Sequence, residues 1–156
     1  MFSISLIVSL ICMIVDQLIK IAVMGNLSLN YSNVVIENFF SLTYVENDGA
    51  AWSILSGNRV FLILISIIAI ILIYGYLLKN KNMKKFELMC YSILIGGIMG
   101  NLMDRIKFGF VVDYLDFKIF GYGFPIFNFA DICIVISVIL LLICGIKEDI
   151  KCKKLK

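Results

Sequence analysis

Apolar residues dominate four stretches of the chain, at about residues 2–24, 60–78, 86–103 and 127–146. A helix that crosses a bilayer core of about 30 Å needs about 20 predominantly apolar residues, and each stretch is close to this length. The second stretch contains no charged residue at all. The pattern therefore predicts an integral membrane protein, mainly α, with four transmembrane helices in a single membrane-embedded domain that covers residues 1–156.

Lysines between and after these stretches indicate how the helices are oriented. "KNKNMKK" at residues 79–85 holds four lysines, and the tail from Lys147 onward holds five more. Cytoplasmic loops are enriched in Lys and Arg, so both termini are expected in the cytoplasm, and the connections at about 25–59 and 104–126 outside. Nucleic-acid binding by the tail is disfavoured, because topology alone explains a lysine cluster beside a membrane helix. The first stretch lacks the pattern of a cleavable signal peptide.

The first outward connection has the pattern of short strands. "NVVI" at 33–36 and "FSLTYV" at 40–45 are rich in β-branched and aromatic residues and lie between turn residues, and the "NDG" that follows predicts a tight turn. Trp52 comes next, either as an interfacial anchor or in a loop that touches a substrate. The second connection, at 104–126, is rich in Phe, Tyr and Gly, and we expect a loop along the membrane surface with Asp113 at a strand end or turn. A small extracytoplasmic β-sheet is therefore expected beside the helices.

Histidine is absent from the 156 residues, and none of the five cysteines lies in a CxxC pair. Ser-His and Cys-His hydrolase chemistry and the usual zinc sites are thereby excluded. A general acid or base must then be Asp, Glu, Lys, Tyr or Cys. No cofactor or metal is expected, although a carboxylate metal site formed by Asp104, Asp113, Asp116 and Asp131 stays open as an alternative.

Three of the predicted helices carry a polar residue at a similar depth. At a rise of 1.5 Å per residue, Asp16 and Asn101 lie about 21 Å, and Asp131 about 24 Å, from the cytoplasmic ends of their helices. The outer third of the membrane would then hold a polar cluster from three helices, although independent snorkelling at helix ends would give the same pattern. Gly96 and Gly100, four residues apart, would let another helix approach closely.

Helical spacing pairs these polar residues with neighbours. Asp16 and Lys20 are four residues apart on one helix face, so they are expected to form an ion pair. Asn101, Asp104 and Arg105 also share a face, which gives Arg105 a carboxylate neighbour. Charged residues inside a membrane span are costly and usually mark function, so these residues are candidates for a site.

Asp113 and Asp131 would make a hydrolytic site if they meet. Two carboxylates about 3 Å apart share one proton, because both cannot easily ionise. The charged one can activate a water and the protonated one can donate to a carbonyl oxygen, which is peptide hydrolysis without a covalent intermediate. Alternatively, Asp113 is a loop carboxylate and Asp131 a charge favoured by the helix dipole. An ion or solute carrier with a relay through Asp16, Asp104 and Asp131, and a non-catalytic assembly factor, are further hypotheses.

Four segments form a pattern that is specific in combination. They are "DQLIK", "VENDGAAWSIL", "GGIMGNLMDRIKFGFVVDYLDF" and "FPIFNFADICI". In this order they resemble the first-helix motif, the outer-loop motif and the two signature segments of the lipoprotein signal peptidase family, also called signal peptidase II, and the resemblance covers essentially the whole chain. It implies a four-helix aspartic endopeptidase of the bacterial cytoplasmic membrane that cleaves prolipoproteins before a diacylglyceryl cysteine, near the outer face.

The resemblance also implies roles for particular residues. Asp113 and Asp131 match the catalytic pair of the family, and Asp104 is expected to hold Arg105. Ten residues are implied to bind substrate or support the site: Asp16, Lys20, Asn47, Gly49, Trp52, Asn101, Asp104, Arg105, Asn128 and Ala130. The expected partners are diacylglyceryl-modified prolipoprotein signal peptides and membrane lipid, with no nucleic acid, and the protein is expected to act as a monomer.

Overall fold

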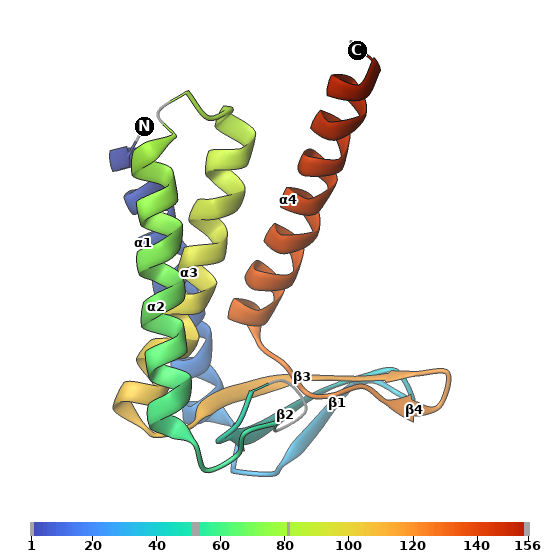
Figure 1. The fold of residues 1–156 in the computed structure, drawn as a ribbon. Helices are drawn as coiled ribbons and strands as arrows, with labels where there is room; N and C mark the ends of the chain where they lie inside the picture. The colour runs from blue at the N-terminus through green and yellow to red at the C-terminus, as the bar shows by residue number, and fades with distance from the viewer. Residues whose placement is uncertain (1, 51–53, 81, 155–156) are drawn as a thin grey trace.

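Four helices and a small sheet make up the computed structural model, which describes residues 2–50, 54–80 and 82–154 (Figure 1). The helices are α1 (Phe2–Asn26), α2 (Arg59–Lys79), α3 (Lys85–Lys107) and α4 (Phe129–Lys154). All four are long and apolar enough to cross a membrane. The predicted fold class, mainly helical with four membrane spans, is confirmed.

α3 is the central helix of the bundle. Half of its most apolar window is buried, against 11 to 22% of the corresponding windows in the other three helices. Large apolar side chains lie exposed on the outside of α1, α2 and α4, among them Leu18, Leu72 and Leu142. Extended apolar surfaces of this kind mark contact with a membrane or a partner. α3 is therefore surrounded by protein, whereas the other helices offer their outer faces to lipid.

Three glycines of α3 let α1 and α4 approach it closely. A Cβ atom at Gly96 would lie 2.7 Å from a carbonyl oxygen of α1, and one at Gly97 would lie 2.6 Å from the carbonyl oxygen of Ala130 in α4. At Gly100 it would lie 2.5 Å from the Asp16 carboxylate. The close approach predicted for Gly96 and Gly100 is confirmed, and Gly97 adds the contact with α4.

The connections at one end of the bundle form a single antiparallel sheet in the order β1-β2-β3-β4. Its strands are β1 (Ser32–Ile36), β2 (Phe40–Asn47), β3 (Val111–Ile119) and β4 (Tyr122–Gly123). The two strands predicted in the first connection are therefore confirmed. On one face of the sheet, Tyr44, Val112 and Tyr114 pack against Val23 of α1, which fixes the sheet to the bundle.

The second connection differs from its prediction. α3 continues to Lys107, so residues 104–107 are helical, and the expected surface loop contains the nine-residue strand β3. Asp113 is the third residue of this strand, and lies neither at its end nor in a turn. The first four residues of β3 are all buried, so the alternation of polar and apolar residues that marks a half-exposed strand is missing from the sequence.

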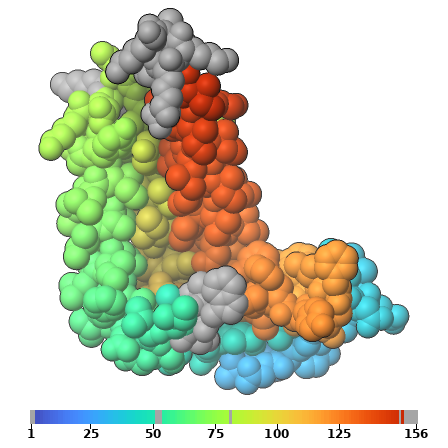
Figure 2. All heavy atoms as spheres, turned by 45° about the vertical axis from the view of Figure 1, so that its right-hand side comes forward, coloured from blue at the N-terminus to red at the C-terminus, as the bar shows by residue number. Residues whose placement is uncertain are grey.

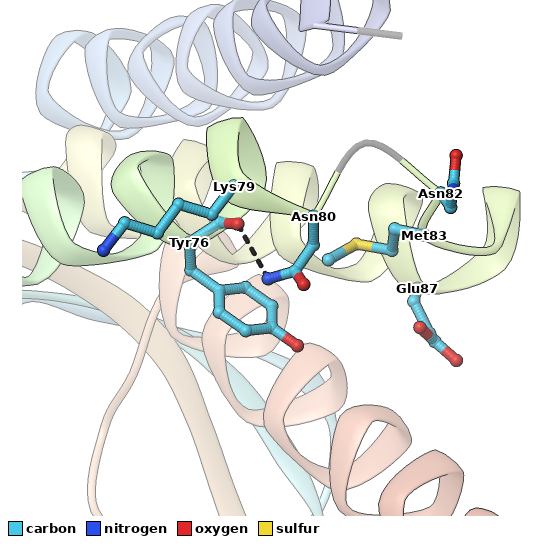
Figure 3. Close-up of a pocket in the computed structure, with 6 residues that line it drawn as sticks. All are labelled: Tyr76, Lys79, Asn80, Asn82, Met83 and Glu87. Atoms are coloured by element: carbon cyan, nitrogen blue, oxygen red, sulfur yellow. Dashed lines mark hydrogen bonds between the residues drawn. The ribbon is translucent and has the colours of Figure 1, made fainter.

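Both chain ends and the lysine-rich link between α2 and α3 lie at the end of the bundle opposite the sheet (Figure 1). α4 begins two residues later than expected and continues through the lysine-rich tail to Lys154. Figure 3 shows a pocket at this end, lined by Tyr76, Lys79, Asn80, Asn82, Met83 and Glu87. No predicted site residue that the structure describes lines this pocket. Those predicted site residues that the structure describes gather instead at the sheet end.

Candidate active site

Polar side chains from three helices meet at the sheet end of the bundle. Asp16 in α1 accepts a hydrogen bond from the backbone N–H of Ala130 in α4, at 3.0 Å. Asn101 in α3 donates from Nδ2 to Oδ1 of Asp131 in α4, at 2.7 Å. Depth counting predicts that Asp16, Asn101 and Asp131 lie at one level, and these contacts confirm it.

Asn128, the residue before α4, connects the two aspartates of the predicted pair. Its Nδ2 donates to Oδ1 of Asp113 at 2.6 Å. Its backbone N–H donates to Oδ2 of Asp131 at 3.1 Å, and its Oδ1 accepts from the backbone N–H of Asp131 at 3.0 Å. This reciprocal pair of bonds is a capping box, in which the N-cap residue and the third helical residue satisfy each other's N–H groups. Asp131 therefore caps α4 and, through Asn128, shares a hydrogen-bond network with Asp113.

Asp113 is almost completely buried, with 3% of its surface exposed. Nδ2 of Asn47 donates to its Oδ2 at 2.9 Å, so both carboxylate oxygens accept a hydrogen bond. Burial and the neighbouring charge of Asp131 raise the pKa of Asp113 to about 7, although the bonds from Asn47 and Asn128 act to lower it. Asp113 therefore gains or loses its proton near neutral pH.

A lysine and two aspartates form a buried ion cluster next to this network. Nζ of Lys20 lies 2.9 Å from Asp16 and 2.8 Å from Asp104, and it donates to Oδ1 of Asn101 at 2.9 Å. The three charged side chains are at most 1% exposed. The predicted pair of Asp16 and Lys20 is confirmed. Because Asn101 also binds Asp131, the cluster holds one of the two predicted catalytic side chains in place.

Asp104 is held differently from its prediction. In place of Arg105, its carboxylate binds Lys20, accepts from Nε2 of Gln17 at 2.7 Å, and accepts from the backbone N–H of Val112 at 3.1 Å. The chain turns back after α3 and brings β3 beside Asp104, which spacing along one helix does not reveal. Gln17 is not among the predicted site residues. Its position directly after Asp16, in a helix that is otherwise mostly apolar, is the available signal for it.

Arg105 connects α3 to the loop that follows β2. Its guanidinium donates to the carbonyl oxygen of Gly49 at 2.8 Å and to that of Asn101 at 3.4 Å. The backbone N–H of Gly49 donates to Oδ1 of Asn47 at 3.0 Å, which closes the predicted "NDG" turn as an Asx turn. Trp52, the remaining predicted residue of this loop, lies outside the described residues.

The carboxylates considered for a metal site are engaged in other contacts. Asp104 binds Lys20, and Asp116 accepts a hydrogen bond from Thr43 at 2.7 Å. Within the described ranges, no three or more His, Cys, Asp and Glu side chains form a group that could hold a metal ion. The arrangement instead offers two neighbouring aspartates held by amide side chains, which suits acid-base chemistry.

The family follows from comparison with known proteins. A family model described as Signal peptidase (SPase) II matches residues 8–147. The chain belongs to the signal peptidase II family. Lipoprotein signal peptidases from Clostridium tetani and Lactiplantibacillus plantarum are each 42% identical to it over 92% of this chain, and the matches cover 93% and 95% of their own lengths.

Solved structures agree with this assignment to the signal peptidase II family. A bacterial membrane enzyme determined by the in meso method at 2.3 Å resolution has a TM-score of 0.87 and 37% sequence identity, and the match covers 94% of this chain and 90% of that chain. The predicted resemblance is therefore confirmed, and the chain is a membrane peptidase. Family membership favours hydrolysis over the carrier and assembly-factor hypotheses.

Proposed function

We propose that this peptidase removes signal peptides from lipid-modified prolipoproteins in the bacterial cytoplasmic membrane, by cutting before the diacylglyceryl cysteine with Asp113, Asp131 and a water. The observation that carries the proposal is the shared network at the sheet end, in which Asn128 binds both aspartates. The proposal is also supported by the relatives, because proteins named lipoprotein signal peptidase align over most of the chain.

The proposed chemistry uses one proton on the aspartate pair. Asp113, whose pKa is about 7 because of burial and the charge of Asp131, donates its proton to the carbonyl oxygen of the scissile bond. Asp131, which accepts two hydrogen bonds, takes a proton from the attacking water. When the tetrahedral intermediate collapses, Asp131 passes that proton to the leaving nitrogen, the C–N bond breaks, and a hydroxyl of the intermediate returns a proton to Asp113.

The neighbouring residues would hold the pair and the substrate. Lys20, with Asp16 and Asp104, orients Asn101 and through it Asp131. Arg105 ties the Gly49 turn to α3, so the loop after β2 would cover the bound peptide. We assign Trp52 to substrate contact on the strength of its motif, and Ala130 to close packing beside Asp16, because it is completely buried.

The substrate would enter along a furrow in the helix bundle. Figure 2 shows α3 (yellow) recessed between α2 (green) and α4 (red), and both of these helices pack against α3. A signal-peptide helix in the furrow would keep lipid contact on its outer side while its scissile bond reaches the sheet end. The lysine-rich end is proposed to face the cytoplasm, which puts the aspartates near the outer face. We propose a monomer as the active unit.

The test is cleavage of a synthetic lipidated precursor by the purified protein in lipid vesicles. Asp113→Asn and Asp131→Asn are each expected to lower kcat by about 100- to 10,000-fold, because each removes one of the two proton-transfer groups. Asp116→Asn is the matched control, since Asp116 lies on the same strand as Asp113 but binds Thr43, and it should keep most of the activity. Normal cleavage by either Asn variant of the pair would refute the catalytic assignment, and equal cleavage of an unlipidated precursor would refute the proposed specificity.

A further inference from the structure

Five phenylalanine rings form a continuous cluster on the sheet, which we call the aromatic ledge: Phe39, Phe40, Phe117, Phe124 and Phe127. Phe117 is at its centre, stacked on Phe40 at 4.6 Å between ring centroids and on Phe127 at 5.7 Å. Phe39 meets Phe117 edge to face at 5.6 Å, and Phe124 meets Phe127 in the same way at 5.7 Å. Such geometries are the favoured ones for aromatic pairs.

The aromatic ledge lies on the same face of the sheet as Asp113. Phe117 follows Asp113 by four residues on β3, and side chains at even spacing along a strand leave the same face. Phe40 is paired with Phe117 in the register of β2 and β3, so its ring shares that face. At about 3.3 Å per residue, the centre of the ledge lies about 13 Å along the strand from Asp113. Phe127 connects the ledge to Asp113. Its ring stacks on Phe117, and it directly precedes Asn128, whose side-chain amide donates a hydrogen bond to Asp113.

The rings are only partly covered by the protein itself. Phe39 and Phe124 are 48% and 45% exposed, and Phe40, Phe117 and Phe127 are half-buried. Val112 and Tyr114, whose side chains leave the opposite face of β3, pack against Val23 of α1. The face with Asp113 is therefore polar at one end, around the two aspartates, and aromatic at the other.

We propose that the aromatic ledge is a subsite for the acyl chains of the lipid-modified cysteine in the substrate. This inference rests on the proposed function, because it takes the scissile bond to lie at Asp113 and Asp131. A diacylglyceryl cysteine combines a polar peptide bond with long apolar chains a short distance away, and the sheet face offers the same change from polar to apolar. Burial of acyl chain against the rings would stabilise the complex by the hydrophobic effect.

The acyl chains of the substrate fit the ledge better than free membrane lipid does. The ledge is continuous with the candidate active site through Phe127 and Asn128. A general membrane anchor needs no such connection, since exposed rings anywhere on the bilayer-facing surface would serve. The ledge would thus select for lipidation, in addition to any contribution to membrane attachment.

The test compares precursors whose cysteine carries long acyl chains, short acyl chains or none, in vesicles of one lipid composition. In the unsubstituted protein, KM should fall as the chains lengthen. Phe117→Ala and Phe127→Ala should each flatten this dependence, with a loss of about ten- to hundredfold in kcat/KM for the long-chain precursor relative to the short-chain one. Phe117→Leu, which keeps an apolar side chain, should restore most of the preference. Phe86→Ala is the control, since Phe86 is an exposed ring in the first turn of α3, at the lysine-rich end.

The possible outcomes separate this inference from the proposed function. An unchanged ratio between long-chain and short-chain precursors in both Ala variants would overturn the subsite, and so would an equal loss with every precursor, which is the result expected of a membrane anchor. Melting temperatures in the same vesicles identify a variant that fails to fold. If an Ala variant does so, the test rests on Phe117→Leu, whose preference for long-chain over short-chain precursors should be close to that of the unsubstituted protein. Failure of the proposed function would appear instead as activity in Asp113→Asn.

Discussion

Two lysines, one at each end of the bundle, have the same kind of partners and very different surroundings. Lys20 lies between Asp16 and Asp104 at the sheet end, and all three side chains are at most 1% exposed. Lys84 lies between Glu87 and Glu148 at the opposite end, where the lysine is 67% and Glu148 53% exposed. Only the first trio is connected to the candidate active site, through Asn101.

The difference shows that burial, and not the number of ion pairs, decides what such a group contributes. Charges removed from solvent are costly unless they are paired and hydrogen-bonded, so loss of one partner leaves the others uncompensated. Exposed ion pairs are screened by water and salt and contribute little. Lys20 can therefore hold Asn101 and Asp131 rigidly, whereas Lys84 serves as an exposed contact between α3 and the end of α4.

The largest effect in this comparison is expected from removal of the buried lysine. Lys20→Met leaves Asp16 and Asp104 buried without a cation, and should destabilise the fold by about 3–5 kcal/mol and abolish most of the cleavage. Melting temperature and precursor cleavage, both in vesicles, measure the two effects. Lys84→Met is the matched control and should leave both within experimental error. Similar losses in the two variants would show that burial does not distinguish the two ends.

A substitution that changes packing and leaves all charges in place should have a smaller effect. A Cβ atom at Gly97 would lie 2.6 Å from the carbonyl oxygen of Ala130, so Gly97→Ala must move α4, and with it Asp131. We expect a loss of about 1–3 kcal/mol in stability and a clear loss of cleavage.

Gly75 of α2 provides the matched control for this substitution. A Cβ atom there would meet nothing within 4 Å, and Ala is the better helix former. Gly75→Ala should therefore leave the melting temperature unchanged or slightly raised. If Gly97→Ala proves equally harmless, close packing of α3 against α4 is not what positions Asp131.

The smallest effect is expected in the pH dependence of cleavage. Because the proposed reaction needs a proton on Asp113, whose pKa is about 7, kcat/KM should fall as the pH rises through about 7. The bond from Asn47 stabilises the charged form and lowers this pKa. Asn47→Ala should therefore raise the pKa and move the alkaline decline of kcat/KM upward by about half to one pH unit. A shift toward lower pH would contradict the assignment of this decline to Asp113.

Several elements could be predicted from the sequence because their cause is local. Length and composition of the apolar stretches are sufficient to identify the helices, and β-branched runs between turn residues identify β1 and β2. Spacing of four residues predicts the pair of Asp16 and Lys20, and the 1.5 Å rise per residue predicts the common level of Asp16, Asn101 and Asp131.

Other features could not be predicted from the sequence, because they depend on contacts between segments that are far apart in the chain. β3 is buried along its first four residues and so lacks an alternating pattern. Asp104 was expected to hold Arg105, its neighbour on the same helix. Its observed partners come from α1 and β3 instead. Gln17 directly follows Asp16 in the sequence, but its contact with Asp104 joins α1 to α3 and cannot be predicted from spacing along one helix.

For Asp131, the depth in the membrane can be predicted from the sequence, whereas its hydrogen-bond partners are known only from the folded chain. Its position at the head of an apolar helix, level with polar residues on two other helices, is a matter of counting residues. Two alternatives were open, a helix-capping charge and a member of an aspartate pair, and the structure shows that the capping carboxylate also shares Asn128 with Asp113. The physical reason is that periodicity determines depth and helix face, whereas the partner of a buried carboxylate depends on which strand the fold brings beside it.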